Sequence, residues 1–415
     1  MDKCRENFHI PYLCPMIDPA TIAYVQAHLH DNPERLLLSA PHNGQVDIRF
    51  AVQQIKARRR VKDKLPAWYA HPRLVFPSAL ACEQASSEET ARYKQRFLQQ
   101  GASVIDGTGG LGVDSVSFSS MADKVVYIEQ NESLCEAAAY NFNTLGLNNI
   151  EVRQGDCIEQ LPALPSVDFI YMDPSRRDRR RQRLFALSDC VPNIVDIKEI
   201  LLQKAPKVLV KVSPMADIRQ SLRVLPEAAQ IHVLSVKNEC KELLFLLERP
   251  LKKPVPAEQV PISCAHIDTA GKEHLFVFCL GEEEATQTTY TDRPPVGYLY
   301  EPNSSLLKAG AFKLPASRFG LQKLHPHTHL YHALDLHDSF PGRIFHIKEV
   351  LHFNKQTIKT LHKTVPQANV AVRNFCMEAH ELQKRLKIRD GGNIYLFGVS
   401  LSDQSYALVV TTKEN

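Results

Sequence analysis

The chain has 415 residues, 44% of them hydrophobic and 23% charged, and its formal net charge at pH 7 is +4. This balance is typical of a globular protein, and the length suggests two to four domains. No apolar run is long enough to cross a bilayer, which excludes a membrane-embedded protein, and Met1–Glu6 lacks the apolar core of a signal peptide. Ten cysteines without a Cys-x-x-Cys pair indicate free thiols in the cytoplasm rather than disulfides or a zinc site.

Residues 1–100 have the pattern of a helical domain. Apolar residues recur at helical spacing, and carboxylates follow serine caps in the segment Glu83–Thr90. Helices are expected to start at Asp18-Pro19, to span Phe50–Lys62, and to run through Tyr93 and Phe97. The second of these ends in the basic cluster Arg58–Arg60, which an exposed helix end explains nearly as well as a nucleic-acid contact.

Strands and helices alternate regularly over residues 101–250. The expected strands are Ser103–Asp106, Lys124–Glu129, Ile150–Arg153, Val167–Met172, Lys207–Val212, Ile231–Val236 and Leu243–Leu247. Helices are expected at Glu132–Leu145 and Asp196–Lys204. The alternation predicts an α/β fold, a Rossmann-like sheet of seven strands with helices on both faces. The last strand should be antiparallel, because the short segment Lys237–Lys241 cannot make a parallel crossover.

A proline-rich linker, residues 249–256, leads to the C-terminal part of the chain. Residues 256–330 are expected to form a small α+β domain, in which a ferredoxin-like arrangement is one possibility. Residues 331–415 should form a second compact α+β unit. Its expected elements are strands at Ile344–Val350, Ala368–Val372, Ile394–Val399 and Tyr406–Thr411, with helices at Asn354–Lys363 and Cys376–Leu386.

The segment Val104–Gly112 reads as a buried strand that ends on a carboxylate and enters a glycine-rich turn before a helix. The spacing of Gly107, Gly109 and Gly112 is by itself a weak signal for a nucleotide-like ligand. Glycines at such a turn let the backbone approach a ligand, and the helix that follows adds a partial positive charge.

Acidic residues at successive strand ends narrow the choice of ligand. Asp106 would repel a pyrophosphate, whereas it suits the amino group and sulfonium of S-adenosylmethionine (SAM). Glu129, about 20 residues further on, is placed to hold two ribose hydroxyls, and Asp156 to accept from the adenine amine. The full candidate set for the cofactor is Asp106, Gly107, Thr108, Gly109, Gly112, Asp114, Glu129, Gln130, Asp156 and Cys157. A nicotinamide dinucleotide and plain loop caps remain the alternatives.

These motifs resemble those of the class I SAM-dependent methyltransferases over roughly residues 102–248. Asp106–Asp114 looks like the motif of RNA-modifying members of that class. The segment Phe76–Ala91, together with the C-terminal unit, is similar to a bacterial family of THUMP-like-domain methyltransferases. Because THUMP domains bind RNA, the resemblance implies a structured RNA substrate. It also implies that the Ser86–Thr90 helix closes over the methionine end of SAM, although an ordinary capped helix explains this segment as well.

The candidate reaction centre is Asp173-Pro174, directly after the fourth expected strand. In related amino-methylating enzymes this place carries Asn/Asp-Pro-Pro and an aromatic residue, which accept hydrogen bonds from the target amine. Here Ser175 and Arg176 replace the second proline and the aromatic residue, which weakens the assignment to a base amine. Asp173 would act as a hydrogen-bond acceptor and proton acceptor. The alternative is that Asp173-Pro174 simply ends a strand.

Two further stretches carry concentrated polar chemistry. The run Arg176–Arg183 follows the reaction centre, so Arg176, Arg177, Arg179 and Arg180 are candidates for RNA phosphate contacts, with a solvated arm as the alternative. The histidine-rich stretch His325–His329 lacks a nearby cysteine set, and surface or interdomain packing is favoured over a metal site.

These features together predict a cytoplasmic SAM-dependent methyltransferase that acts on rRNA or tRNA, at a base amine, without a metal or a membrane partner. Two rivals stay open. One is an NAD-dependent oxidoreductase, and the other is a non-catalytic RNA-binding or assembly protein built on a methyltransferase scaffold. The sequence names neither the RNA nor the methylated atom, and it does not settle the oligomeric state.

Overall fold

The structure is a computed structural model of the chain, and it describes residues 18–38, 46–176, 187–249 and 255–414. The chain forms two compact units. The first holds the residues up to Val212 together with Phe245–Lys253, and the second holds Ser213–Leu244 and the chain from Pro254 onward. The finer division into four domains stays a prediction.

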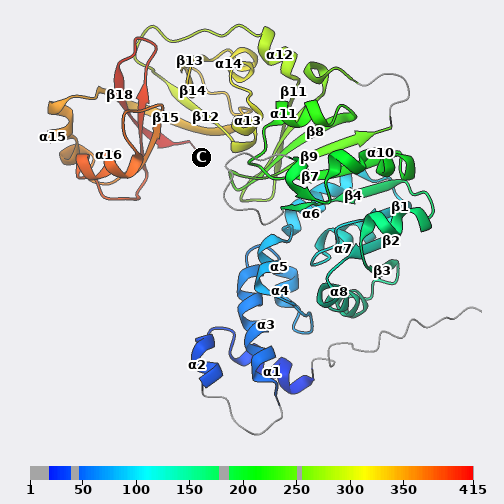
Figure 1. Cartoon of the computed structure of the whole chain (residues 1–415). Coiled ribbons are helices and arrows are strands. Elements are labelled where there is room, and N and C mark those ends of the chain that lie inside the picture. The colour runs from blue at the N-terminus through cyan, green and yellow to red at the C-terminus, as the bar shows by residue number, and fades with distance from the viewer. Residues whose placement is uncertain (1–17, 39–45, 177–186, 250–254, 415) are drawn as a thin grey trace, which may run out of the picture. The chain divides into compact units, whose positions relative to one another are not determined.

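The first unit begins with a series of short helices (Figure 1). They are α1 Pro19–Ala27, α2 Pro33–Leu38, α3 Ile48–Val61, α4 Pro66–Ala70, α5 Ala79–Gln84, α6 Glu88–Lys94 and the 3₁₀ turn η1 Gln95–Phe97. Side chains cap their first turns: Asp18 Oδ1 accepts from Thr21 N at 2.8 Å, and Ser87 forms a capping box with Thr90. The three predicted helices are present, and the one predicted to run through Tyr93 and Phe97 is formed by α6 and ends in η1.

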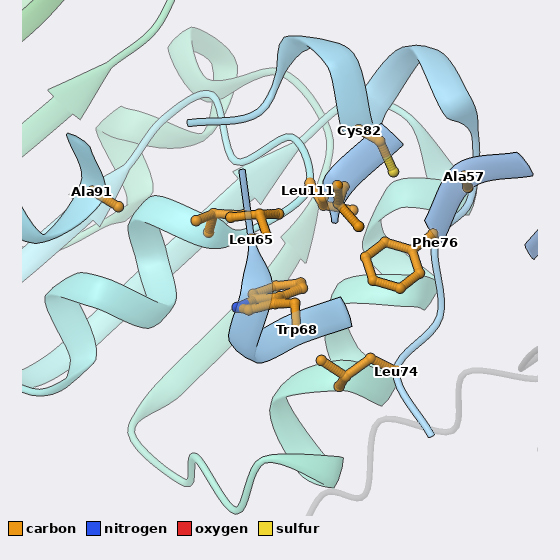
Figure 2. Close-up of a cluster of buried hydrophobic side chains, with 10 residues drawn as sticks. Ala57, Leu65, Trp68, Leu74, Phe76, Cys82, Ala91 and Leu111 are labelled. Atoms are coloured by element: carbon orange, nitrogen blue, oxygen red, sulfur yellow. The ribbon is translucent and has the colours of Figure 1, made fainter. Parts of the chain in front are cut away.

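A core cluster joins these helices to the segment after strand β1 (Ala102–Asp106) (Figure 2). Trp68 and Phe76 lie with their ring centroids 6.4 Å apart, and Leu65 and Leu74 are fully buried beside them. Leu111, which belongs to the glycine turn, packs into the same cluster. The N-terminal helices are therefore held against the turn by apolar packing, which is the strongest non-directional term in folding.

One residue of the basic cluster at the end of α3, Arg58, belongs to the interior, whereas Arg59 and Arg60 are exposed. The Arg58 guanidinium is buried and donates to the carbonyl oxygens of Tyr69, His71, Pro72 and Leu74, at 2.7 to 3.2 Å. Burial lowers the pKa of Arg58 to about 10. The exposed-helix-end interpretation is thus wrong for Arg58, because a polar side chain that can satisfy several carbonyls is stable inside the fold.

The first unit also contains the central parallel strands. They are β1 Ala102–Asp106, β2 Ala122–Glu129, β3 Ile150–Gln154, β4 Phe169–Met172 and β7 Lys207–Val212. Their order is β7-β4-β1-β2-β3, and the four pairs that they form are parallel. The helices that alternate with them are α7 Val113–Ser119, α8 Glu132–Thr144, α9 Cys157–Gln160 with η2 Leu161–Ala163, and α10 Ile194–Lys204.

Strand β9 (Glu239–Glu248) belongs to both units. Phe245–Glu248 belongs to the first unit and Glu239–Leu244 to the second, and in the order of the sheet the strand stands between β7 and β8 (Ala228–Val236). Lys237 and Asn238 alone connect β8 to β9, and both have positive φ, 50° and 64°. A two-residue turn of this kind joins antiparallel strands, so the predicted antiparallel final strand is confirmed against β8.

The second unit extends the large sheet further than expected. After α11 Ile218–Val224 and β8, its elements are the 3₁₀ turn η4 Ala257–Gln259, β10 Ile262–Ile267, β11 Glu273–Phe278 and α12 Leu280–Ala285. Strand β10 pairs in parallel with β8 and antiparallel with β11. Over the described residues the sheet therefore has nine strands rather than the seven expected, because β10 and β11 add to its edge.

A second sheet of seven strands fills the rest of this unit, in the order β13-β14-β12-β15-β18-β17-β16. The strands are β12 Tyr298–Pro302, β13 Gln322–His325, β14 Thr328–Ala333, β15 Gly342–His352, β16 Asn369–Arg373, β17 Ile394–Ser400 and β18 Tyr406–Lys413. The helices are α13 Ser304–Ala309, α14 Leu314–Phe319, α15 Lys355–Thr364 and α16 Ala379–Leu386. Leu361 of α15 and Leu382 of α16 pack on β17 and β18 through Leu396 and Leu408.

The α/β class and the α+β character of the C-terminal region are confirmed by these elements. In the described part of the chain, no helix combines the length and the apolar composition that crossing a membrane requires.

Replacing Arg58 by methionine should lower the free energy of unfolding by about 3 kcal/mol, because the carbonyl groups it satisfies lose their donors inside the protein. Arg58→Lys should recover part of that loss, since an ammonium group has fewer donors than a guanidinium. Urea unfolding measures both. Arg60, which is exposed and pairs with Glu83 at 3.2 Å, offers the matched control, and Arg60→Met should change stability by less than about 0.5 kcal/mol. Equal losses at the two positions would contradict the buried role of Arg58.

Candidate active site

The turn between β1 and α7 lies so close to its neighbours that side chains do not fit. A Cβ on Gly107 would stand 2.6 Å from both Cys157 Sγ and Met172 Sδ, and one on Gly109 would overlap the ring of Tyr127. The Gly107 N–H donates to Tyr171 O at 3.0 Å and the Gly109 N–H to Ile128 O at 2.9 Å. Two of the predicted glycines are thus explained by close packing against β2 and β4.

Gly112 and Thr108 hold the two ends of this turn. Gly112 has φ +85°, a left-handed conformation, and a Cβ there would meet the ring of Phe142 at 2.7 Å. Thr108 Oγ1 accepts a hydrogen bond from the backbone N–H of Asp173 at 2.6 Å. The turn is therefore tied directly to the segment that carries the candidate reaction centre.

Asp106 lies at the end of β1 and is almost fully buried. Its carboxylate accepts from Ser115 Oγ at 2.6 Å and from the Thr108 N–H at 3.3 Å. Burial raises the pKa of Asp106 to about 7, and the nearby carboxylates of Asp114 and Asp173 act in the same direction, against the hydrogen bond from Ser115. A carboxylate held in this way gains most from a cationic ligand.

Glu129 ends β2, and both of its carboxylate oxygens hold backbone groups. Oε2 accepts from the Gly110 N–H at 2.9 Å, and Oε1 accepts from the Asn131 N–H at 2.9 Å. These contacts fix the orientation of the carboxylate. Each oxygen keeps a further lone pair, so the group can still accept from a hydroxyl.

The predicted residues after β3 form a helix start. Asp156 Oδ1 caps α9 by accepting from the Ile158 N–H at 2.7 Å, while Oδ2 accepts from Gln130 Nε2 at 2.6 Å. Cys157 is buried, and its sulfur is adjacent to Gly107. Burial raises the pKa of the Cys157 thiol to about 12, so this side chain lines the turn as a neutral group.

Asp114, in the first turn of α7, is surrounded by protein donors. Oδ1 forms an ion pair with Lys94 Nζ at 2.9 Å, and Oδ2 accepts from Ser86 Oγ at 2.7 Å and from Tyr171 Oη at 3.2 Å. Burial by itself would raise the pKa of this carboxyl, but Lys94 and Lys211 outweigh it and hold the pKa below the ordinary value. Asp114 therefore joins the Ser86–Lys94 segment to the sheet.

Asp173 lies directly after β4 and is half-buried with Pro174. Its Oδ2 accepts from Lys211 Nζ at 2.6 Å, and Lys211 belongs to the neighbouring strand β7. Three carboxylates (Asp106, Asp114, Asp173) and two lysines (Lys94, Lys211) are thus gathered around the glycine turn.

The chain after Pro174 turns back on itself. Ser175 and Arg176 form strand β5, which pairs antiparallel with β6 (Cys190–Val191), just after the 3₁₀ turn η3 Leu187–Asp189. The other arginines predicted to contact RNA, Arg177, Arg179 and Arg180, lie outside the described residues.

Sequence reasoning missed Lys94 and Lys211 as parts of this site, and it linked Ser86 to the site only through the resemblance to known methyltransferases. A signal for Lys211 was present, because it is a charged residue inside the apolar strand Lys207–Val212, one position before the strand ends. Lys94 gave a weaker signal, since a lysine in an amphipathic helix normally reaches solvent.

The histidine-rich stretch gives no metal site in the part of the chain that is described. No group of three His, Cys, Asp or Glu side chains among those residues could hold an ion. His329 stacks on Phe312 with ring centroids 3.7 Å apart, and the Nδ1 of His325 is within 3.1 Å of Asn374 Nδ2. Both histidines pack within the second unit.

Three family models match the chain. Residues 79–177 match the protein-L-isoaspartate(D-aspartate) O-methyltransferase family, residues 298–341 a ferredoxin-like domain, and residues 342–413 a THUMP domain-like family. No curated protein matches it. The glycine turn, the parallel sheet and the matched families together define a methyltransferase. Its C-terminal region is ferredoxin-like and THUMP-like.

Among solved structures, the "putative methyltransferase" from Porphyromonas gingivalis W83 is 35% identical, with a TM-score of 0.87, covering 95% of this chain and 98% of that one. The chain belongs to the same family of THUMP-like-domain methyltransferases. A "putative rRNA-methylase" from Clostridium thermocellum is 13% identical, with a TM-score of 0.31, covering 39% of this chain and 96% of that one. A SAM-dependent methyltransferase from Aquifex aeolicus is 19% identical, with a TM-score of 0.29, covering 38% of this chain and 89% of that one. Both are too distant to add to the family assignment.

The buried pair of Lys94 and Asp114 predicts a large loss of stability when one partner is removed. Lys94→Met should lower the free energy of unfolding by about 3 kcal/mol, because it leaves a buried carboxylate without its cation. The double variant Lys94→Met/Asp114→Asn should regain part of that loss. Urea unfolding measures each. The exposed Lys124, paired with Glu151, is the control, and Lys124→Met should cost less than about 1 kcal/mol. If Lys94→Met lowered the free energy of unfolding as little as Lys124→Met does, the role of Lys94 in a buried ion pair would be contradicted.

The raised pKa of Asp106 predicts a pH-dependent contribution to stability. The unfolded chain releases this proton near pH 4, whereas the folded protein keeps it to about pH 7. The folded state therefore binds more protons in this window, and the contribution of Asp106 to stability falls as pH rises through it. Comparing the free energy of unfolding at about pH 5 and about pH 8, the wild type should lose more stability on going to high pH than Asp106→Asn. Parallel pH curves for the two proteins would show that Asp106 is not perturbed.

Proposed function

We propose that this protein is a cytoplasmic SAM-dependent methyltransferase that transfers a methyl group to a base amine of rRNA or tRNA. The observation that carries the cofactor proposal is the charge at the glycine turn. The carboxyl groups of Asp106, Asp114 and Asp173 outnumber the ammonium groups of Lys94 and Lys211, and a cation bound at Asp106 would favour the ionised form of that carboxyl. An excess of negative charge suits SAM, whose sulfonium and ammonium outnumber its carboxylate, and opposes a dinucleotide pyrophosphate.

The cofactor would lie along the carboxyl ends of β1, β2 and β3, where ligands of open α/β sheets bind. Asp106 and the Gly107–Gly112 turn would face its methionine part, and Glu129 would accept from the ribose hydroxyls. Gln130, Asp156 and Cys157 would surround the adenine. Thr108 links this surface to Asp173, so cofactor and acceptor would be positioned by one continuous segment.

The chemistry at the acceptor would be carried by Asp173 and Pro174. When bound, SAM supplies a methyl group activated by its sulfonium. Asp173 would accept a hydrogen bond from the target amine, and the carbonyl of Pro174 would accept a second. Both contacts turn the nitrogen lone pair toward the methyl group, and this positioning provides most of the rate. The carboxylate can then take up the proton that the amine loses.

Support for an RNA acceptor comes from the THUMP-like match over residues 342–413 and from the charge of the same region. Its two helices and the loop after α16 expose seven basic side chains: Lys355, Lys359, Lys363, Lys384, Arg385, Lys387 and Arg389. Clusters of this kind bind phosphate backbones through sequence-independent, salt-dependent contacts.

The test is methyl transfer from radiolabelled SAM to total RNA from cells that lack this gene, followed by mass spectrometry of the nucleosides. The wild type should label this RNA, and RNA from cells with the gene should take up less. Asp173→Ala should lower the rate by at least about 100-fold. Asp123→Ala, an exposed change at the other end of the sheet, should leave it unchanged.

Isothermal titration with SAM and with NAD(H) separates the proposed cofactor from its rival. Binding of NAD(H) without SAM would overturn the methyltransferase assignment. Tight RNA binding without labelling of any RNA would instead favour a scaffold protein.

A further inference from the structure

Lys211 is the charged side chain next to the candidate reaction centre on the adjacent strand. The parallel register pairs Tyr171 with Leu209 and Met172 with Val210, so Asp173 and Lys211 are the next pair in line. Paired residues of neighbouring strands point to the same side of a sheet. The register thus brings the two side chains together, with Lys211 Nζ 2.6 Å from Asp173 Oδ2.

The pair is shielded from solvent but not sealed off. The Lys211 side chain is 16% exposed and that of Asp173 is 31% exposed. Lys211 also acts electrostatically on Asp114, whose own cation is Lys94. Lys94 is therefore the cation of Asp114, and Lys211 is the cation of Asp173 at the candidate reaction centre.

Asp173 is fixed at two points. Its backbone N–H donates to Thr108 Oγ1 at 2.6 Å, and its Oδ2 is held by Lys211. Because Lys211 holds Oδ2, we assign Oδ1 to the acceptor group. An orientation fixed before the acceptor binds lowers the cost of aligning the reacting atoms.

We propose that Lys211 is a positioning residue for methyl transfer, which holds the carboxylate of Asp173 so that its Oδ1 faces the acceptor. This inference rests on the proposed function. In the step it serves, the lone pair of the acceptor nitrogen forms the new N–C bond while the C–S bond of the sulfonium breaks and leaves a neutral thioether. The nitrogen loses its extra proton to the Asp173 carboxylate, which passes it to water. Lys211 exchanges no proton in this step, and its charge is the same before and after.

The experiment compares Lys211→Met, Lys211→Arg and Lys207→Met in the full chain. Lys207 is the matched control, because it lies on the same strand and faces a carboxylate, Glu248, at 4.0 Å. Lys211→Met should lower kcat for labelling of total RNA from cells lacking the gene by at least about tenfold. The Kd for SAM should stay within about threefold of the wild type, since the lysine acts on the acceptor side. Lys211→Arg, which keeps the charge and donates, should restore kcat to within about threefold of the wild type.

The two proposals fail in different ways. A wild type that labels no RNA overturns the proposed function and this inference with it. A wild type that labels RNA while Lys211→Met is equally active overturns the inference alone. So does a Lys211→Met variant that slows transfer and is not rescued by Lys211→Arg, or one that loses SAM binding in step with kcat, because either result describes a structural or cofactor-binding lysine. Thermal unfolding of each variant confirms that the compared proteins are folded.

Discussion

The close approach of the Gly107–Gly112 turn to β2 and β4 is the constraint on which the rest of the site depends. Without side chains at Gly107 and Gly109, the backbone reaches the carbonyl groups of Tyr171 and Ile128 and packs against Tyr127 and Met172. That contact sets where Asp106 ends its strand and where α7 begins. It also brings Thr108 within hydrogen-bond distance of Asp173. One tight turn therefore fixes both halves of the candidate site, and the N-terminal helices reinforce it by packing on Leu111.

Charge compensation is the second organising feature. Burying a carboxylate costs free energy unless cations or hydrogen-bond donors lie beside it. The three aspartates around the turn have different partners of this kind. Asp114 has Lys94, Ser86 and Tyr171, and Asp173 has Lys211. Asp106 accepts from a serine hydroxyl and a backbone N–H, and burial raises the pKa of its carboxyl. Asp106 is therefore the carboxyl whose charge a cation could still compensate. The cationic cofactor is proposed to bind beside it.

The sequence was most informative where residues close in the chain act together. Strand and helix alternation, the glycine spacing and the caps at Asp18 and Ser87 are local patterns, and the structure contains all of them. Contacts between distant segments were harder to foresee. The partnership of Lys94 with Asp114 spans 20 residues and that of Lys211 with Asp173 spans 38, so neither follows from spacing. Arg58 was misjudged for the same reason, because the carbonyls that satisfy it come from a separate turn. The edge strands β10 and β11 were missed because a proline-rich linker suggested a domain boundary.

The path of the chain through β9 bears on how the protein is made. The first compact unit gains its last strand from Phe245–Glu248, after the chain has already contributed Ser213–Leu244 to the second. During synthesis, a nascent chain that stops at Val212 lacks the strand that borders β7. The large sheet therefore cannot be completed in simple N-to-C order, because part of the second unit is synthesised before the last strand of the first. For the same reason, neither unit corresponds to a single continuous stretch of the gene.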